Sequence, residues 1–201
     1  VGRTAIKVLE EYNLPISEIA FFASERSAGS KIKFNGKDYT VRELVDSSFD
    51  EGFHFAIFSA GSDVAKHFAP IAASKGCIVV DNSSAFRMED NIPLVVPEVN
   101  SEEIKNNHGI IANPNCSTIQ AVVPLKVLDD KYKIKRIVYS TYQAVSGAGQ
   151  KGVDDLQNGL KGESPKKFPY QIVNNCLPHI DVFLDNGYTK AVSYTHLTLP
   201  T

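Results

Sequence analysis

The feature that most constrains the fold is the alternation of short apolar segments with a helical stretch between residues 19 and 112. Four apolar segments have the length and the β-branched or aromatic content of buried strands, and they cover residues 19–23, 55–59, 78–81 and 110–112. A helix is expected from about 63 to 75, where Gly76 ends it. This alternation is typical of βαβ units, so we predict a doubly wound parallel α/β sheet.

Two features elaborate this first part of the chain. The dipeptide Asn35-Gly36 lies between residues 32–34 and 39–41 and favours a tight antiparallel hairpin. Before the first strand, the apolar residues Val8 and Tyr12 recur at helical spacing and predict an N-terminal helix.

The pattern changes after residue 115. A long helix is expected first, then a strand at 136–144 whose β-branched residues favour an extended chain, and then a helix from about 151 to 161. A polar loop with two prolines follows at 161–169. These elements predict the start of a second domain, of α+β type.

Composition excludes several classes of protein. The 201 residues are 43% hydrophobic and 22% charged with a net charge of -2, enough to bury a core in one large or two small domains. There is no long basic run to bind nucleic acid, and no apolar stretch approaches the roughly 18 residues of a membrane span. We therefore expect no nucleic-acid or membrane partner and a cytoplasmic location.

The three cysteines, Cys77, Cys116 and Cys176, are too widely spaced for a disulfide framework or a clustered zinc site. We expect reduced thiols and no bound metal. Cys116 differs from the others because the turn Asn113-Pro114-Asn115 delivers it from a strand to the start of a helix. The free backbone N–H groups and the helix dipole there favour a thiolate. Spacing alone equally allows a small buried residue in a tight turn.

A polar turn after the first predicted strand suggests the cofactor. A doubly wound fold meets the adenosine ribose of a dinucleotide at this place. Arg26 and Ser27 can bind a ribose 2′-phosphate, which favours NADP over NAD, although Glu25 beside them would suit a free 2′-hydroxyl. The alternative is a solvated surface turn.

Five segments together carry a resemblance to a known family. They are residues 23–29, 58–62, 80–87, 113–120 and 140–149. In this order they closely resemble the aspartate-semialdehyde dehydrogenases of the bacterial type, and the likeness runs from Val1 to about Lys190. The resemblance implies a Rossmann-like sheet followed by the start of an α+β catalytic and dimerisation domain.

The resemblance also implies an activity. Members reduce L-4-aspartyl phosphate to L-aspartate 4-semialdehyde with NADPH, through an acyl-thioester on cysteine, in lysine, threonine and methionine biosynthesis. The expected partners are these small substrates, inorganic phosphate and, for the full-length enzyme, a second copy of the chain. There are two alternatives. One is a related enzyme that acts on N-acetyl-glutamyl phosphate or glyceraldehyde 3-phosphate, and the other is an inactive nucleotide-binding fragment.

The resemblance assigns roles to individual residues. Cys116 matches the nucleophile, Asn115 and Gln143 lie beside it and contact the substrate, and Arg87 matches the phosphate-binding arginine, where the alternative is a surface arginine. The matching cofactor residues are Gly2, Ser24, Arg26, Ser27, Ser59, Ala60, Gly61, Ser146 and Gly147. Gly149, in the same turn as Gly147, is expected to serve backbone geometry.

The two ends depart from the family pattern. Residues 1–115 are expected to be an NADP-binding domain that lacks its first strand and most of its glycine turn, and 116–190 a partial catalytic and dimerisation domain. The family's acid/base histidine comes later in sequence, so we expect this chain to be inactive alone. Residues 191–201 resemble translated cloning sequence, with a short strand at 194–199 as the alternative.

Overall fold

The computed structural model describes residues 2–178, 180, 182–185, 187 and 189. The chain forms two compact units, Val1–Pro114 and Asn115–Thr201. The expected tail at 191–201 and the alternative strand at 194–199 lie outside the described residues.

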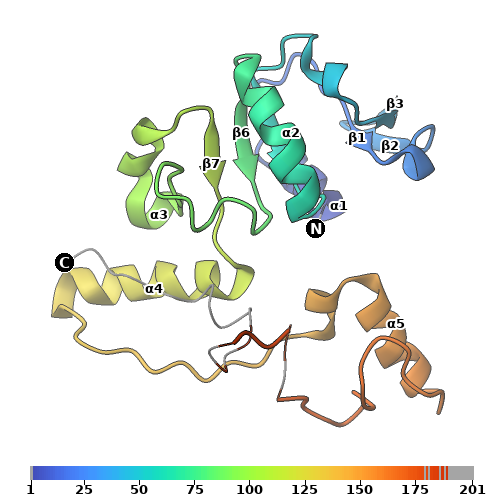
Figure 1. Cartoon of the computed structure of the whole chain (residues 1–201), viewed down its shortest axis with the longest axis vertical. Coiled ribbons are helices and arrows are strands. Elements are labelled where there is room, and N and C mark those ends of the chain that lie inside the picture. The colour runs from blue at the N-terminus through green and yellow to red at the C-terminus, as the bar shows by residue number, and fades with distance from the viewer. Residues whose placement is uncertain (1, 179, 181, 186, 188, 190–201) are drawn as a thin grey trace. The chain divides into compact units, whose positions relative to one another are not determined.

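The first unit contains the sheet strands and the helices around them (Figure 1). In chain order its elements are α1 (Gly2–Glu11), β1 (Phe22–Ala23), η1 (Glu25–Ser27), β2 (Lys31–Phe34), β3 (Lys37–Thr40), β4 (Arg42–Glu43), η2 (Asp46–Phe49), β5 (Phe55–Phe58), α2 (Ser62–Ser74), β6 (Ile78–Asp81), α3 (Pro97–Asn100), η3 (Ser101–Asn106) and β7 (Ile110–Ala112).

A three-stranded parallel sheet in the order β5-β6-β7 is the centre of this unit. Helix α2 runs beside β6 (Figure 1) and buries Ala65, Ala69 and Ala72 against it. Small side chains on this face let the helix approach the sheet closely. Gly76 follows the helix with a φ of +84°, a conformation that glycine adopts at no steric cost. The predicted parallel α/β architecture is confirmed.

A second pair of parallel strands, β1 and β4, belongs to the same unit. The strand expected at 19–23 shortens to Phe22–Ala23, because only these two residues lie opposite residues of β4. Phe22 packs 5.9 Å, centroid to centroid, from Phe53 and 6.2 Å from Phe49, which in turn stacks on Phe58 of β5. One aromatic cluster therefore joins the β1 pair to the three-stranded sheet.

The hairpin predicted at Asn35-Gly36 is confirmed. Strands β2 and β3 pair antiparallel, and the two turn residues have φ angles of +47° and +77°. These left-handed angles match the sheet twist, and asparagine and glycine tolerate them best. The Asn35 backbone N–H donates to the Glu10 carboxylate at 2.6 Å, which ties the turn to α1.

The second unit contains α4 (Cys116–Tyr132), η4 (Val145–Ala148) and α5 (Gln150–Gly159). The long helix after residue 115 and the helix near 151–161 occur where the sequence predicted them. The strand predicted at 136–144 was wrong, because the structure assigns no strand to these residues. Their β-branched side chains favour an extended chain, but a strand also needs a partner for its backbone, and no described segment pairs with this one.

One buried carboxylate organises the end of this unit. Asp155 of α5 is 5% exposed and accepts hydrogen bonds from the backbone N–H groups of Lys166, Lys167 and Phe168 at 2.7–2.9 Å. Burial alone would raise the pKa of Asp155, but the three backbone donors outweigh it and hold this pKa below the ordinary aspartate value.

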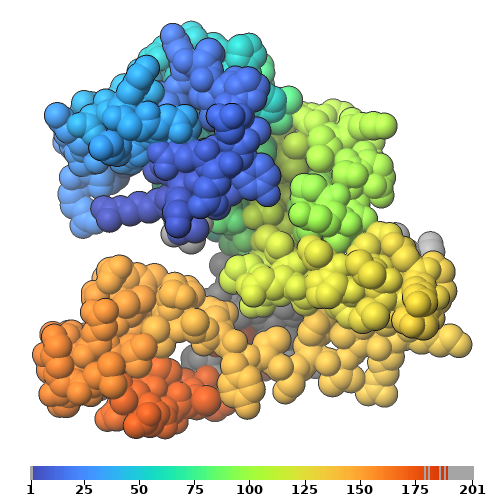
Figure 2. All heavy atoms as spheres, turned by 180° about the vertical axis from the view of Figure 1, so that it is seen from behind, coloured from blue at the N-terminus to red at the C-terminus, as the bar shows by residue number. Residues whose placement is uncertain are grey.

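The loop that Asp155 holds also contacts the helix through a glycine. A methyl group built on Gly152 would lie 2.9 Å from Cβ of Ala148 and 3.3 Å from Cζ of Phe168, and closer still to the Val145 carbonyl oxygen. In Figure 2 the orange atoms of α5 and the redder atoms of the loop that follows it lie against one another. The close approach requires glycine at this position of α5.

Candidate functional site

The N-terminus of α4 presents the candidate nucleophile. Cys116 is the first residue of the helix, and its free thiol is exposed. Asn115 caps the helix, with its Oδ1 accepting from the Ser117 backbone N–H at 2.9 Å. The buried alternative for Cys116 was therefore wrong. Cys116 thus lies in the first turn of a 17-residue helix, where backbone N–H groups lack helical partners and the dipole is positive.

Arg87 is held by the carboxyl ends of two neighbouring strands. Its Nε donates to the Asn113 carbonyl oxygen at 2.9 Å and its Nη2 to the Asn82 carbonyl oxygen at 3.1 Å. The Asn113 side-chain amide donates to Asn82 Oδ1 at 2.6 Å and closes the network between the residues after β6 and β7. The guanidinium is thus fixed on the fold, which a surface arginine in a loop would not be.

A buried carboxylate shapes the turn that carries Arg87. Asp81 is fully buried at the end of β6 and accepts from the backbone N–H of Ser83 at 3.0 Å and from its Oγ at 2.7 Å. The Ser83 Oγ accepts in turn from the Ala85 N–H at 3.0 Å. No role is expected for Asp81 or Ser83 from the sequence pattern. The sequence feature that could have indicated them is the charged Asp81 at the end of an apolar strand.

The predicted ribose-side turn lies where the sequence placed it, directly after β1. Ser24 precedes the short helix η1, and its carbonyl oxygen accepts from the N–H groups of Ser27 and Ala28 at 2.8 and 3.1 Å. Arg26 is exposed, and its guanidinium has no ion-pair or hydrogen-bond partner among the described residues. The turn therefore offers a cation and a hydroxyl to a ligand.

The predicted turn at Ser59, Ala60 and Gly61 leads from β5 into α2. Gly61 precedes the helix with a φ of +101°, and a methyl group built there would meet nothing within 4 Å. The helix N-terminus beyond it is therefore approachable along the backbone. Ser62 joins this turn to the one after β6, because its Oγ lies 2.8 Å from Oγ of Ser84. No sequence pattern indicates this contact between residues 22 positions apart.

The remaining predicted residues fall into two places. Gln143, Ser146 and Gly147 come together at η4, where all three are exposed and the Gly147 N–H donates to the Ala144 carbonyl at 3.0 Å. Gly2 is exposed at the start of α1. Arg87 and the ribose-side turn belong to the first unit, and Cys116 and Gln143 to the second.

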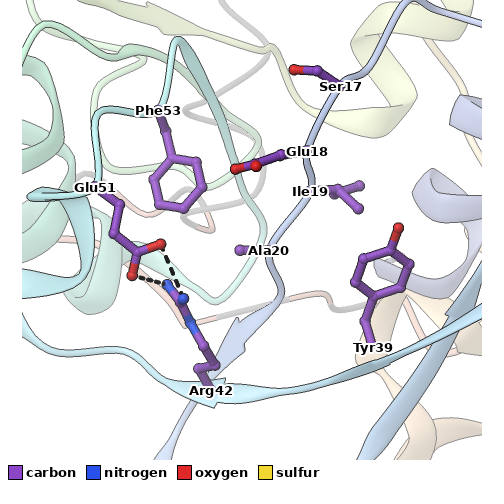
Figure 3. A pocket seen from close by; sticks show the side chains of 8 residues that line it. All are labelled: Ser17, Glu18, Ile19, Ala20, Tyr39, Arg42, Glu51 and Phe53. Atoms are coloured by element: carbon purple, nitrogen blue, oxygen red, sulfur yellow. Dashed lines mark hydrogen bonds and ion pairs between the residues drawn. The ribbon is translucent and has the colours of Figure 1, made fainter.

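Two pockets lie in the described part of the chain, and none of the predicted site residues lines either of them. One, of about 280 Å³, lies between residues 17–20 and the strands β3 and β4, and Figure 3 shows its lining. Arg42 and Glu51 form a bidentate pair at its edge, with Nη2–Oε1 and Nη1–Oε2 distances of 2.8 and 3.1 Å. The pair satisfies both charges within the protein.

Within the described part of the chain, no group of three or more histidine, cysteine, aspartate or glutamate side chains could hold a metal ion. None of the described helices is both long enough and apolar enough to cross a membrane.

Comparison with known families defines the class of protein. Residues 1–107 match the family described as semialdehyde dehydrogenase, NAD binding domain, and residues 125–193 match semialdehyde dehydrogenase, dimerisation domain. The chain belongs to the semialdehyde dehydrogenase family.

Within this class the chain is similar to aspartate-semialdehyde dehydrogenases. It is 56% identical over 199 residues to that of Aquifex aeolicus, covering 94% of this chain and 58% of the relative. It is 46% identical over 201 residues to that of Campylobacter jejuni, covering 94% and 59%. The crystal structure of aspartate semialdehyde dehydrogenase II from Vibrio cholerae superposes with a TM-score of 0.89 at 47% identity, covering 94% and 59%. The chain thus spans about three fifths of the length of these relatives.

Proposed function

We propose that this chain is part of an NADP-dependent aspartate-semialdehyde dehydrogenase, which converts L-4-aspartyl phosphate to L-aspartate 4-semialdehyde and inorganic phosphate. The observation that carries the proposal is the free, exposed thiol of Cys116 at the N-terminus of α4. Similarity to relatives of that name over 94% of the chain supports the choice of substrate.

The first step belongs to Cys116. Its thiolate sulfur attacks the carbonyl carbon of the acyl phosphate, a bond forms between sulfur and carbon, and the bond from carbon to the phosphate oxygen breaks. Inorganic phosphate leaves with that electron pair, and a thioester on Cys116 remains. Cys116 lies at the positive end of the α4 dipole.

Arg87 binds the phosphate in this proposal. A guanidinium offers several N–H donors in a fixed plane and suits an oxyanion. Hydrogen bonds to the carbonyl oxygens of Asn82 and Asn113 hold it in one orientation before substrate arrives. Such preorganisation avoids part of the ordering cost of binding.

Asn115 and Gln143 orient the substrate carbonyl in this proposal. Neither amide titrates, so both can donate a hydrogen bond to the oxygen that becomes negative when sulfur attacks. Asn115 is oriented by its cap on α4, through the bond from the Ser117 N–H.

The cofactor side is built on the first unit. When bound, NADPH supplies the hydride that reduces the thioester, after which the aldehyde leaves and the thiolate is restored. The exposed Arg26, with Ser24 and Ser27, suits the 2′-phosphate. The open space at Gly61 lets a dinucleotide backbone approach the start of α2.

The remaining cofactor contacts are proposed for three other places. Ser59 and Ala60 line the approach to α2, Ser146 and Gly147 belong to the η4 turn, and Gly2 lies at the start of α1. We further propose that the complete enzyme is a cytoplasmic homodimer. The match of residues 125–193 to a dimerisation domain supports that assembly.

The test uses a hybrid enzyme, in which residues 2–189 replace the matching part of the Aquifex aeolicus relative. We expect it to reduce NADP only when both aspartate semialdehyde and phosphate are present. Cys116→Ser should abolish turnover. Arg26→Ala should raise the KM for NADP much more than that for NAD.

Three results would contradict the proposal. A hybrid that acts on N-acetyl-glutamate semialdehyde instead would place the chain in the related reductase class. A hybrid that binds NADP without turnover would favour a nucleotide-binding role. Full activity of the Cys116→Ser variant would show that the reaction does not pass through a thioester on Cys116.

A further inference from the structure

Two glycines in the η4 turn are needed for different physical reasons. Gly149 has a φ of +76°, and a methyl group built on it would meet nothing within 4 Å, so its backbone conformation explains the residue. Gly147 has no positive φ. Any residue could adopt the backbone conformation of Gly147. The reason for glycine at this position must therefore be the space that a side chain would occupy.

The space at Gly147 is filled by Gln143. A methyl group built on Gly147 would lie 2.8 Å from Cδ and 3.1 Å from Cγ of Gln143, and closer still to its Nε2. The three nearest atoms all belong to that one side chain. The Gln143 amide therefore lies directly against the Cα of Gly147.

We propose that Gly147 is a positioning residue, which fixes where the Gln143 amide lies by leaving room for it. The inference rests on the proposed function, in which that amide donates a hydrogen bond to the substrate carbonyl. It assigns Gly147 a role through Gln143 that differs from contact with the cofactor.

The chemistry of the contact sets the expected behaviour. Gln143 is exposed and ends in a flexible side chain, so an added methyl group at Gly147 displaces the amide and leaves the backbone in place. A displaced amide weakens the stabilisation of the developing oxyanion, which lowers kcat. Loss of a cofactor contact at Gly147 would instead raise the KM for NADP, whichever residue stands at position 143.

A double-mutant cycle in the hybrid enzyme tests the proposal. Gly147→Ala should lower kcat about 100-fold, the lower end of the loss that follows removal of one oxyanion donor. In a Gln143→Ala background, which removes Cγ, Cδ and Nε2, the same change should have almost no further effect. Gly149→Ala is the matched control, because its backbone strain should lower activity by the same factor with either residue at position 143.

The opposite pattern overturns the inference. If Gly147→Ala raises only the KM for NADP, and equally in both backgrounds, Gly147 serves the cofactor and does not position Gln143. If it leaves kcat unchanged, the position of the amide does not matter for the reaction.

A measurement without turnover separates this inference from the proposed function. In the isotopically labelled 201-residue chain, a nuclear Overhauser effect should connect the Gln143 side-chain amide protons to the Gly147 α protons. Its absence would refute the contact, whatever the hybrid does. Its presence in a chain whose hybrid lacks the proposed activity would refute the function and leave the contact standing.

Discussion

The two units of the chain are stabilised in different ways. The first buries an apolar core around β6, with Val79 fully buried and Phe58 7% exposed. In the second unit, Val122 is the one buried apolar side chain among the described residues, while Val127 and Val138 are 69% and 76% exposed. The second unit is organised instead by polar contacts to backbone, at Asn115 and Asp155.

This difference has a consequence for the site. A buried core fixes the frame that carries Arg87, because burial of each large apolar side chain contributes on the order of 1.5–3 kcal/mol. Cys116 and Gln143 depend on a helix cap and a short turn, which contribute less. The proposed nucleophile and the proposed carbonyl-binding amide therefore occupy the less strongly stabilised unit, where local order depends on a few hydrogen bonds.

The largest contrast should appear in thiol reactivity. Iodoacetamide at neutral pH should label the exposed Cys116 and Cys176 well before the buried Cys77, as read by peptide mass mapping. Burial raises the pKa of the Cys77 thiol and blocks its access, so its modification requires opening of the first unit. Early labelling of Cys77 in folded protein would contradict the difference between the units.

One substitution made in both units sharpens the comparison. Val79→Ala should destabilise the first unit by about 2 kcal/mol, from lost burial and a residual cavity, and so speed Cys77 labelling about 30-fold. Val138→Ala, at a side chain that is 76% exposed, should leave the rate within about twofold. Similar effects of the two would show that both units share one cooperative core.

Removal of the buried carboxylate should affect only the second unit. Asp155→Asn keeps one acceptor oxygen but replaces the other with an amide NH2 group, which cannot accept the hydrogen bond that a backbone N–H donates there. Hydrogen exchange of the backbone amides of residues 166–168 should therefore become faster. The amides of β6 should keep their protection. The control is Asp154→Asn at the exposed neighbour, which should change neither region.

The same carboxylate predicts a pH dependence. The pKa of Asp155 is lower in the folded chain than in the unfolded chain, where it is about 3.9. The stabilisation by the Asp155 carboxylate is therefore complete above the pKa of the unfolded chain and is lost as the pH falls through the pKa of the folded chain. Protection of residues 166–168 should therefore decrease on acidification below about pH 4. The Asp155→Asn variant should lack this step, and a variant that kept it would assign the titration to another group.

The smallest expected effect is at the helix cap. Asn115→Ala removes the acceptor for the Ser117 N–H and should destabilise α4 by about 1 kcal/mol, measured by exchange of its first amides. Asn115→Asp keeps the acceptor oxygen and should restore most of that protection. Equal losses in both variants would show that the cap does not depend on the side-chain oxygen.

Local signals explain what the sequence predicted correctly. The hairpin at Asn35-Gly36 and the helix end at Gly76 each depend on the backbone freedom of one or two residues, which their identity reveals. The exposed position of Cys116 follows from a turn and a helix start that are adjacent in sequence.

Contacts between distant residues explain what the sequence did not predict. The expected strand at 136–144 depends on a partner strand, and its own residues cannot supply one. Asp155 accepts hydrogen bonds from N–H groups 11 to 13 residues away. Almost any residue has a backbone N–H, so the residue types at these positions do not reveal the contact. The anchoring of Arg87 likewise uses carbonyl oxygens that any residue could provide.

The edge of the three-stranded sheet has a practical consequence. Strand β5 pairs with β6, and no other described strand pairs with it, while Phe55 and Ile57 on this strand are 70% and 54% exposed. An apolar strand with free backbone groups is a template for pairing with another chain. The chain as it stands should therefore self-associate as its concentration rises, and a lysine at position 57 is the simplest change that should keep it soluble.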